Sequence, residues 1–137
     1  MKCVDLGPMI VIDASCIYDI VTGAEDASDV RAIIQHYDDP VAPHLVDVEV
    51  IGLIRRDFQR AKLDLSAAEL AVNELQIWPG ERFDHRAFLH RVWELRGNVR
   101  TTDAFYVALA EALKVPLLTF DKRLSRAPGI RCEVITP

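Results

Sequence analysis

Cysteine and histidine are too few and too scattered to form a metal site built from sulfur and nitrogen ligands. The three cysteines, Cys3, Cys16 and Cys132, lie far apart, and no pair has the spacing of metal ligands. We therefore interpret them as reduced thiols in a reducing compartment. His85 and His90 are five residues apart, which places them on different faces of a helix. This pattern argues against a zinc site and against a disulfide framework.

Long hydrophobic runs are also missing. The longest apolar run near the N-terminus, residues 9–12, is too short for a signal-peptide core or a membrane span. We therefore expect a cytoplasmic protein with no membrane segment. The 137 residues are predicted to form a single domain, 1–137. Residues 1–8 precede the first periodic segment and are expected to contribute little to the fold, and Met9 is an alternative start.

Positive charge is not in excess. Lysine and arginine number 16 and aspartate and glutamate number 21, which gives a formal net charge of −5. Proteins held to nucleic acid by bulk charge usually carry a basic excess. An acidic balance suits a basic partner, or a site where several carboxylates surround a cation.

Short apolar segments alternate with helical patterns along the chain. Buried strands are predicted at residues 9–12, in "VPLLTFDKRL" and in "RCEVITP", with a further extended piece between two prolines in "DDPVAP". The helices between them are expected to begin at capping residues, namely Ser28 or Asp29, Ser66 with Glu69, and Thr101 or Thr102. Strands separated by helices at these intervals predict an α/β sandwich with a mostly parallel sheet.

Two aspartates follow predicted buried strands. Asp13 comes directly after "MIVI", and Asp121 comes after "PLLTF". In open parallel sheets, ligands bind outside the carboxyl ends of the strands. Each aspartate is equally suited to be the N-cap of the helix that follows it, so for either one alone both interpretations stay open.

A glutamate lies on the apolar side of a predicted helix. In the helix expected from about residue 44, the apolar stripe contains Val46, Val50 and Leu53. Glu49 lies on this stripe, whereas Asp47 lies off it. Because burying an unpaired carboxylate costs several kcal/mol, Glu49 needs either a functional partner or one of the nearby arginines.

Asp103 completes a set of four acids that a parallel sheet can bring together. It lies in the first turn of the helix in "TTDAFYVALAEAL", where the helix dipole alone also favours a carboxylate. Two unit charges about 4 Å apart repel by roughly 4 kcal/mol at an effective dielectric constant of about 20. A cluster of such acids must therefore hold a cation or keep protons. Because its ligands are oxygen atoms without histidine or cysteine, the predicted cation is Mg²⁺, with Mn²⁺ as a substitute.

Four motifs occur in the order "VIDAS", "LVDVEVIGLIRR", "TTDAFYVALAEAL" and "PLLTFDKRL". With these motifs the chain resembles the PIN domains, and more narrowly the VapC-type ribonuclease toxins of bacterial toxin–antitoxin pairs, from Met9 to about Val134. The resemblance implies a PIN-like three-layer sandwich and a magnesium-dependent endoribonuclease inhibited by a cognate VapB-like antitoxin. It also implies a homodimer, assembled with the antitoxin into a heterotetramer or a larger complex.

The resemblance carries the family's site over to this chain. The positions that match its catalytic quartet are Asp13, Glu49, Asp103 and Asp121, and Ser15 and Thr119 match polar positions that line the site. We expect Asp13 and Asp103 to coordinate the metal directly, and the other two acids to bind it directly or through water. The ion would activate water and stabilise charge on the scissile phosphate.

Affinity for an RNA substrate must come from local basic groups, because the domain as a whole is acidic. The candidates are Arg55, Arg56, Arg60, Lys122 and Arg123. A run of charge is also typical of a solvated helix face. No motif in the chain identifies which RNA is cut.

Two other classes of function fit parts of the pattern. A phosphate-accepting receiver domain has a similar length and an acidic pocket at its strand ends, but it needs an acid pair after the first strand, where "DAS" offers one carboxylate. A catalytically silent interaction module with the same fold is the other alternative. Cleavage of RNA with magnesium, stopped by EDTA, would distinguish a nuclease from both.

Overall fold

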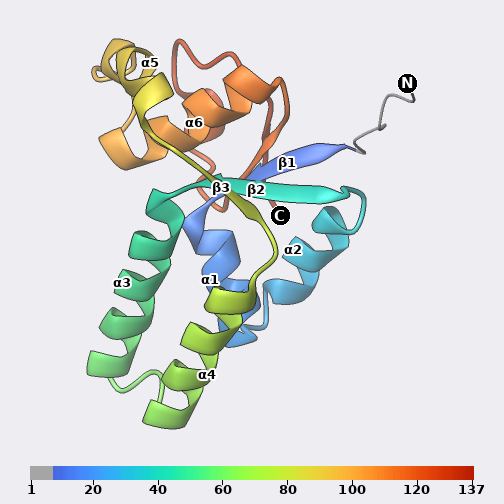
Figure 1. Ribbon diagram of the computed structural model, residues 1–137, viewed down its shortest axis with the longest axis vertical. Coiled ribbons are helices and arrows are strands. Elements are labelled where there is room, and N and C mark those ends of the chain that lie inside the picture. The colour runs from blue at the N-terminus through green and yellow to red at the C-terminus, as the bar shows by residue number, and fades with distance from the viewer. Residues whose placement is uncertain (1–7) are drawn as a thin grey trace.

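The computed structural model describes residues 8–137, which form a five-stranded sheet between two layers of helices (Figure 1). The strands are β1 (Met9–Ile12), β2 (Asp39–Pro43), β3 (Glu81–Phe83), β4 (Leu117–Leu118) and β5 (Val134–Ile135). Their order in the sheet is β3-β2-β1-β4-β5, and every neighbouring pair is parallel. The predicted α/β sandwich with a parallel sheet is therefore confirmed.

Helices cover both faces of this sheet. They are α1 (Ala14–Thr22), α2 (Ala27–Ile34), α3 (Leu45–Gln59), α4 (Leu65–Ile77), α5 (Leu89–Glu94) and α6 (Thr101–Leu113). Figure 1 shows α1 to α4 on one side of the sheet and α5 and α6 on the other. Across residues 8–137, no helix is both long enough and apolar enough to span a bilayer.

The central strand β1 determines where the first acidic motif lies. Ile10, Val11 and Ile12 are fully buried, because β1 pairs with β2 on one side and β4 on the other while helices cover both faces. The strand ends when the backbone N–H of Asp13 donates to the carbonyl of Leu118 at 3.1 Å. The chain thus delivers Asp13 to the middle of the carboxyl edge of the sheet.

The expectation for residues 1–8 falls almost wholly outside the described residues. Of that segment only Pro8 is described, and its carbonyl accepts hydrogen bonds from the N–H groups of Asp38 and Asp39 at 2.9 and 3.4 Å. The small contribution of residues 1–7 to the fold stays a prediction.

The helix caps differ from the predicted ones. Helix α4 is capped by Asp64, whose carboxylate accepts from the N–H of Ala67 at 2.8 Å, and not by the predicted box of Ser66 and Glu69. Helix α6 has Arg100 at its N-cap, so the two threonines predicted as caps are already helical residues. A cap needs a non-helical backbone, which the positions one or two residues earlier supply in both helices.

Arg82 on β3 links the edge of the sheet to helices α3 and α4 through hydrogen bonds. Its Nε and Nη2 atoms donate to the two carboxylate oxygens of Asp47 at 3.2 and 3.0 Å. Its terminal nitrogens also donate to the carbonyls of Leu75, Trp78 and Gly80 at 3.0, 2.7 and 2.8 Å. The guanidinium lies 4.9 Å from the centre of the Trp78 ring. The planar guanidinium therefore supplies hydrogen-bond donors to carbonyls at the end of α4 and in the turn into β3.

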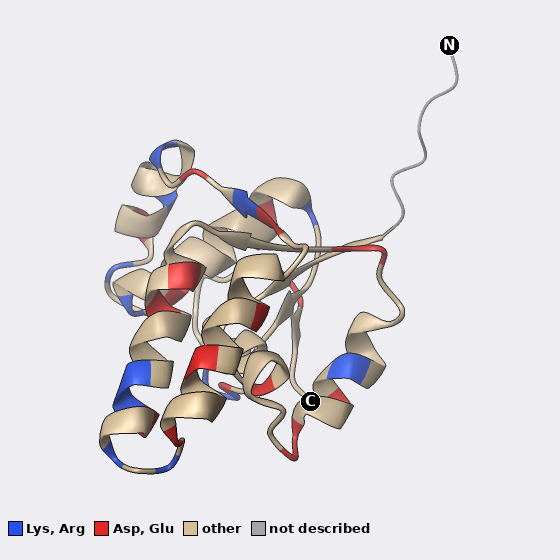
Figure 2. Ribbon diagram, turned by 60° about the horizontal axis from the view of Figure 1, so that its bottom comes forward, with Lys and Arg blue, Asp and Glu red and all other residues tan. Residues whose placement is uncertain are grey.

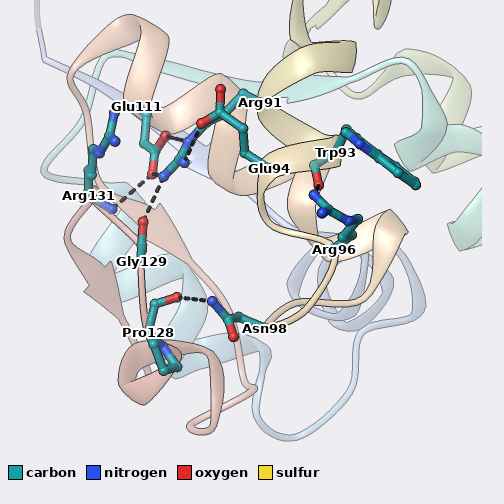
Figure 3. Close-up of polar contacts among 9 residues, drawn as sticks. All are labelled: Arg91, Trp93, Glu94, Arg96, Asn98, Glu111, Pro128, Gly129 and Arg131. Atoms are coloured by element: carbon teal, nitrogen blue, oxygen red, sulfur yellow. Dashed lines mark hydrogen bonds and ion pairs between the residues drawn. The ribbon is translucent and has the colours of Figure 1, made fainter.

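A second arginine fixes the C-terminal segment against α5 and α6 (Figure 3). Arg91 donates to both carboxylate oxygens of Glu111, at 2.7 and 3.0 Å, and to the carbonyl of Gly129 at 2.7 Å. The N–H of Arg131 donates to the same carboxylate at 2.8 Å. These contacts hold the approach to β5 in place, although β5 itself has only two residues.

Replacing Arg82 with lysine should destabilise the fold. Lysine keeps the charge but loses the planar fork that bonds a carboxylate and three carbonyls at once. We expect urea denaturation to show a loss of about 2–4 kcal/mol in the free energy of unfolding. The matched control is Arg31→Lys on α2, where one exposed hydrogen bond to the Ile20 carbonyl is at stake, and it should stay within about 0.5 kcal/mol of the parent. Equal stabilities of the two variants would contradict this role of Arg82.

Candidate active site

Asp13 is held by donors from two sides of the sheet edge. One carboxylate oxygen accepts from the Ser15 hydroxyl at 2.7 Å and from the N–H of Cys16 at 3.1 Å. The other accepts from the Thr119 hydroxyl, beyond β4, at 2.5 Å. The N-cap interpretation of Asp13 is thus confirmed for α1. Asp13 also lines the candidate site, where its role in ligand binding stays a prediction.

The surroundings of Asp13 disfavour its negative charge. Burial raises the pKa of this carboxyl above its ordinary value of 3.8, and the hydrogen bonds from Thr119 and Ser15 offset the rise only in part. Ser15 and Thr119 therefore orient the carboxylate without fully compensating its removal from water. A cation nearby would stabilise the ionised form.

Glu49 lies on α3 and lines the same cavity as Asp13. The Tyr106 hydroxyl of α6 donates to one of its oxygens at 2.7 Å. Burial raises the pKa of Glu49, and the charges of Asp103 and Asp13 raise it further, against the hydrogen bond from Tyr106. No arginine is hydrogen-bonded to Glu49 among residues 8–137, so the alternative of a buried arginine partner is not what holds it.

Three of the four acids line one cavity. Asp13, Glu49 and Asp103 reach it from β1, α3 and α6, and its volume is about 270 Å³. Its other lining residues are Ala14, Ser15, Gly52, Leu53, Arg100 and Tyr106. Tyr106 was not among the predicted site residues, although its position three residues after Asp103 places both on one face of α6.

Asp121 lies in an adjoining cavity of about 240 Å³. Its carboxylate accepts from the N–H of Arg123 at 2.9 Å and from Nε of the same side chain at 3.3 Å. Although burial opposes the shift, these bonds hold the pKa of Asp121 below its ordinary value. The backbone N–H of Asp121 donates to the Thr119 hydroxyl at 3.0 Å, which links this acid to Asp13 through one side chain.

Arg100 is a site residue that the sequence did not reveal. Its Nε atom donates to Asp103 at 3.1 Å. Arg100 and Asp103 are the two residues that line both cavities. The only signal in the sequence is that Arg100 precedes Asp103 by one helical turn, which is a common surface spacing.

The donor chemistry of the site fits a hard cation, because the side chains that converge are carboxylates and hydroxyls. As they stand, however, no three acidic, histidine or cysteine side chains within residues 8–137 are grouped closely enough to hold a metal ion. Tyr106 holds Glu49, and Arg100 holds Asp103. Each of these bonds occupies one carboxylate oxygen, and the other oxygens of Glu49 and Asp103 accept no hydrogen bond from residues 8–137.

The predicted RNA-binding residues fall in two places. Arg55 and Arg56 are exposed in the second half of α3, and Arg60 is exposed at its C-cap. Figure 2 shows basic residues toward the end of the α3–α4 hairpin that is remote from the sheet. These three arginines line neither cavity, whereas Arg123 lines the one that contains Asp121. Lys122 is exposed beside it. A role for any of these residues in RNA binding stays a prediction.

Known proteins resemble this chain over most of its length. The sequence profile of the PIN domain matches residues 10–130. Ribonuclease VapC1 of Mycobacterium tuberculosis is 38% identical over 125 residues, which cover 90% of this chain and 94% of that protein. Ribonuclease VapC12 of the same species is 37% identical over 131 residues, which cover 92% of this chain and 97% of that protein.

Solved structures share the fold. The crystal structure of VapBC2 from Rickettsia felis, bound to a DNA fragment from its promoter, superposes with a TM-score of 0.65 at 14% identity and covers 94% of this chain and 98% of that chain. At this identity the likeness confirms the fold alone. The sequence profile and the two ribonucleases identify the family as well, because they match nearly the whole chain in sequence. They favour a PIN domain over a receiver domain. The chain belongs to the PIN-domain family, among its VapC ribonucleases.

Proposed function

We propose that this protein is a magnesium-dependent endoribonuclease and the toxin of a type II toxin–antitoxin pair. The observation that carries the proposal is the cavity in which Asp13, Glu49 and Asp103 arrive from a central strand and two helices. Two of these acids lie where burial disfavours their charge, an arrangement that is typical of functional sites. Membership among the VapC ribonucleases indicates which chemistry such a site performs.

The chain's own residues have distinct roles in this proposal. Asp13 and Asp103 would hold Mg²⁺, or Mn²⁺ in its place, directly, while Glu49 and Asp121 would hold it directly or through water. A bound divalent cation supplies positive charge against the scissile phosphate and makes water a stronger acid. Ser15 and Thr119 fix the orientation of the Asp13 carboxylate.

The hydrogen bond from Tyr106 orients Glu49 and leaves one of its carboxylate oxygens for water. It occupies one carboxylate oxygen of Glu49, and within residues 8–137 the other oxygen accepts no protein hydrogen bond. That free oxygen is suited to orient the water that attacks the phosphate.

We propose a VapB-like antitoxin as the partner that blocks this site. Two solved structures with this fold are toxin–antitoxin complexes. On α3, the side chains of Val48, Ile51 and Phe58 are 75, 42 and 44% exposed and form one stripe. Ile51 and Phe58 lie on the side of α3 turned away from Glu49, so a peptide packed on this stripe would extend around the helix to place a basic side chain in the cavity. The homodimer and the larger complex expected from the family are part of the same proposal.

Asp13→Asn or Asp103→Asn should abolish magnesium-dependent RNA cleavage while the fold survives. Each change removes a ligand charge and keeps the side chain's size, so we expect at least a hundredfold loss of activity, on the order seen when essential groups of a metal site are altered. Cleavage of labelled RNA with Mg²⁺ and with excess EDTA measures this. Activity close to that of the parent in either variant would contradict the metal assignment.

The matched control for these variants is Asp29→Asn on α2, an exposed aspartate that lines neither cavity. Asp47, although it lies off the apolar stripe, is unsuitable because it accepts two hydrogen bonds from Arg82. A silent interaction module with this fold would show no cleavage in the parent and no effect of EDTA.

Metal-free stability should depend on pH through Asp13. Because the folded protein raises the pKa of this carboxyl above its ordinary 3.8, the folded state keeps a proton that the unfolded chain releases. The resulting stabilisation is complete below pH 3.8 and is lost as the pH rises through the folded-state pKa. Asp13→Asn lacks this dependence, so its stability relative to the parent should increase with pH. Urea denaturation in EDTA at a series of pH values tests this, and a constant difference would refute it.

An antitoxin encoded beside this chain should carry an arginine in its C-terminal half that enters the acidic cavity. Arginine bonds carboxylates bidentately and replaces the charge of a cation. Changing it to alanine should restore cleavage more than it weakens the complex, because the apolar contacts remain. On this chain, Ile51→Asp should weaken the complex and leave the nuclease activity unchanged. The control is Leu89→Asp, at an exposed position on α5, which should change neither the affinity of the complex nor the nuclease activity. A complex that forms but never inhibits would remove the toxin–antitoxin part of the proposal.

A further inference from the structure

Arg100 stands at the junction of the two cavities. The cavity of about 270 Å³ contains Asp13 and Glu49, and the one of about 240 Å³ contains Asp121. Arg100 and Asp103 line both, so their ion pair lies between the acids of β1 and α3 and the acid beyond β4. The charge of Arg100 also acts on Glu49 and Asp121. Asp103, Glu49 and Asp121 therefore share the positive charge of Arg100.

The guanidinium of Arg100 is only partly used. Nε donates to Asp103, while the terminal nitrogens Nη1 and Nη2 donate to no atom of residues 8–137. The side chain is 76% exposed, and its partner Asp103 is 19% exposed. An exposed pair of this kind contributes little to stability, so the fold does not depend on it. Two free donors in a planar fork match the oxygens of a phosphate group.

A divalent cation on Asp103 weakens the Arg100–Asp103 pair. Nε of Arg100 bonds one oxygen of Asp103, and a cation bound directly to the same carboxylate, as proposed above, neutralises the charge that holds Arg100 there. The cation then supplies the positive charge that Arg100 supplies without it, and the two like charges repel. A side chain that is mostly in solvent can turn away at little cost.

We propose that Arg100 exchanges Asp103 for a phosphate of the RNA backbone when a divalent cation enters the carboxylate site. The inference rests on the proposed nuclease function and adds a substrate-binding residue to it. Before the cation binds, Arg100 holds Asp103 in place and partly neutralises the acids. Afterwards the same guanidinium binds a phosphate beside the two cavities that it lines.

The test uses three variants of the full chain. Arg100→Gln removes the charge, Arg100→Lys keeps it without the planar fork, and Arg96→Gln is the control. Arg96 is an exposed arginine four residues away whose guanidinium lies 4.6 Å from the Trp93 ring, and it lines neither cavity (Figure 3). Calorimetry with Mn²⁺ alone measures metal affinity without RNA. Cleavage of a labelled single-stranded RNA at several salt concentrations gives kcat, KM and the salt dependence of KM.

The exchange predicts opposite effects of Arg100→Gln on the two ligands. Mn²⁺ affinity should rise about fivefold, because a competing cation on Asp103 is gone. KM for RNA should rise about tenfold with kcat nearly unchanged, and the slope of log KM against log salt should fall by about 0.7, the value for one phosphate contact on a single strand. Arg100→Lys should retain the salt slope with an intermediate KM. Arg96→Gln should leave Mn²⁺ affinity unchanged.

Each other outcome overturns the proposal in a distinguishable way. If Mn²⁺ affinity rises while KM and its salt slope stay the same, Arg100 is only a counter-ion. If KM rises with Mn²⁺ affinity unchanged, Arg100 does not compete for Asp103, and no exchange occurs. If Arg96→Gln alters KM and the salt slope as much as Arg100→Gln does, the effect is one of bulk charge. If the parent neither binds Mn²⁺ nor cleaves RNA, the nuclease proposal itself fails, and the exchange fails with it.

Discussion

The burial of the Asp13 carboxylate at the end of the central strand is the constraint around which this structure is organised. Its oxygens need donors, and these come from the start of α1 and from Thr119 beyond β4. Glu49 has the same need, and Tyr106 of α6 meets it. The packing of α1, α3 and α6 around the sheet edge therefore fixes the positions of these carboxylates. A change that shifts any of these elements alters the charge state of the site as well as its shape.

Acidic residues in this protein have two kinds of environment. Asp47 accepts two hydrogen bonds from Arg82, and the bonds from Arg91 and Arg131 hold the pKa of Glu111 below its ordinary value although burial opposes this. These acids stabilise the fold. Asp13 and Glu49 have raised pKa values instead, because burial outweighs their neutral donors. The contrast distinguishes Asp13 and Glu49 from Asp47 and Glu111, whereas Asp121 of the proposed site is bonded by Arg123 and has a lowered pKa.

The sequence predicted the elements of the site better than its contacts. Apolar runs and helical periodicity located β1, the stripe with Glu49 and the helix with Asp103, because each is a local pattern. The ion pair of Arg100 and the separate cavity of Asp121 depend on side-chain conformations between distant segments, which leave no periodic signal. The cap of α4 was predicted wrongly for a different reason. Asp64 and Ser66 are both suitable cap residues, but only Asp64 has the non-helical backbone that a cap needs, because the helix already begins at Leu65.

The bond between Thr119 and Asp13 joins residues 106 positions apart in the chain. During synthesis Thr119 is therefore made 106 residues after Asp13. A nascent chain that ends before Leu117 lacks β4, β5 and Thr119, so β1 has an unpaired edge and the carboxylate lacks one of its donors. The acidic site is therefore completed only after Thr119 has been made. Until then the nascent chain carries Asp13, Glu49 and Asp103 without the strand and the hydroxyl that complete their surroundings.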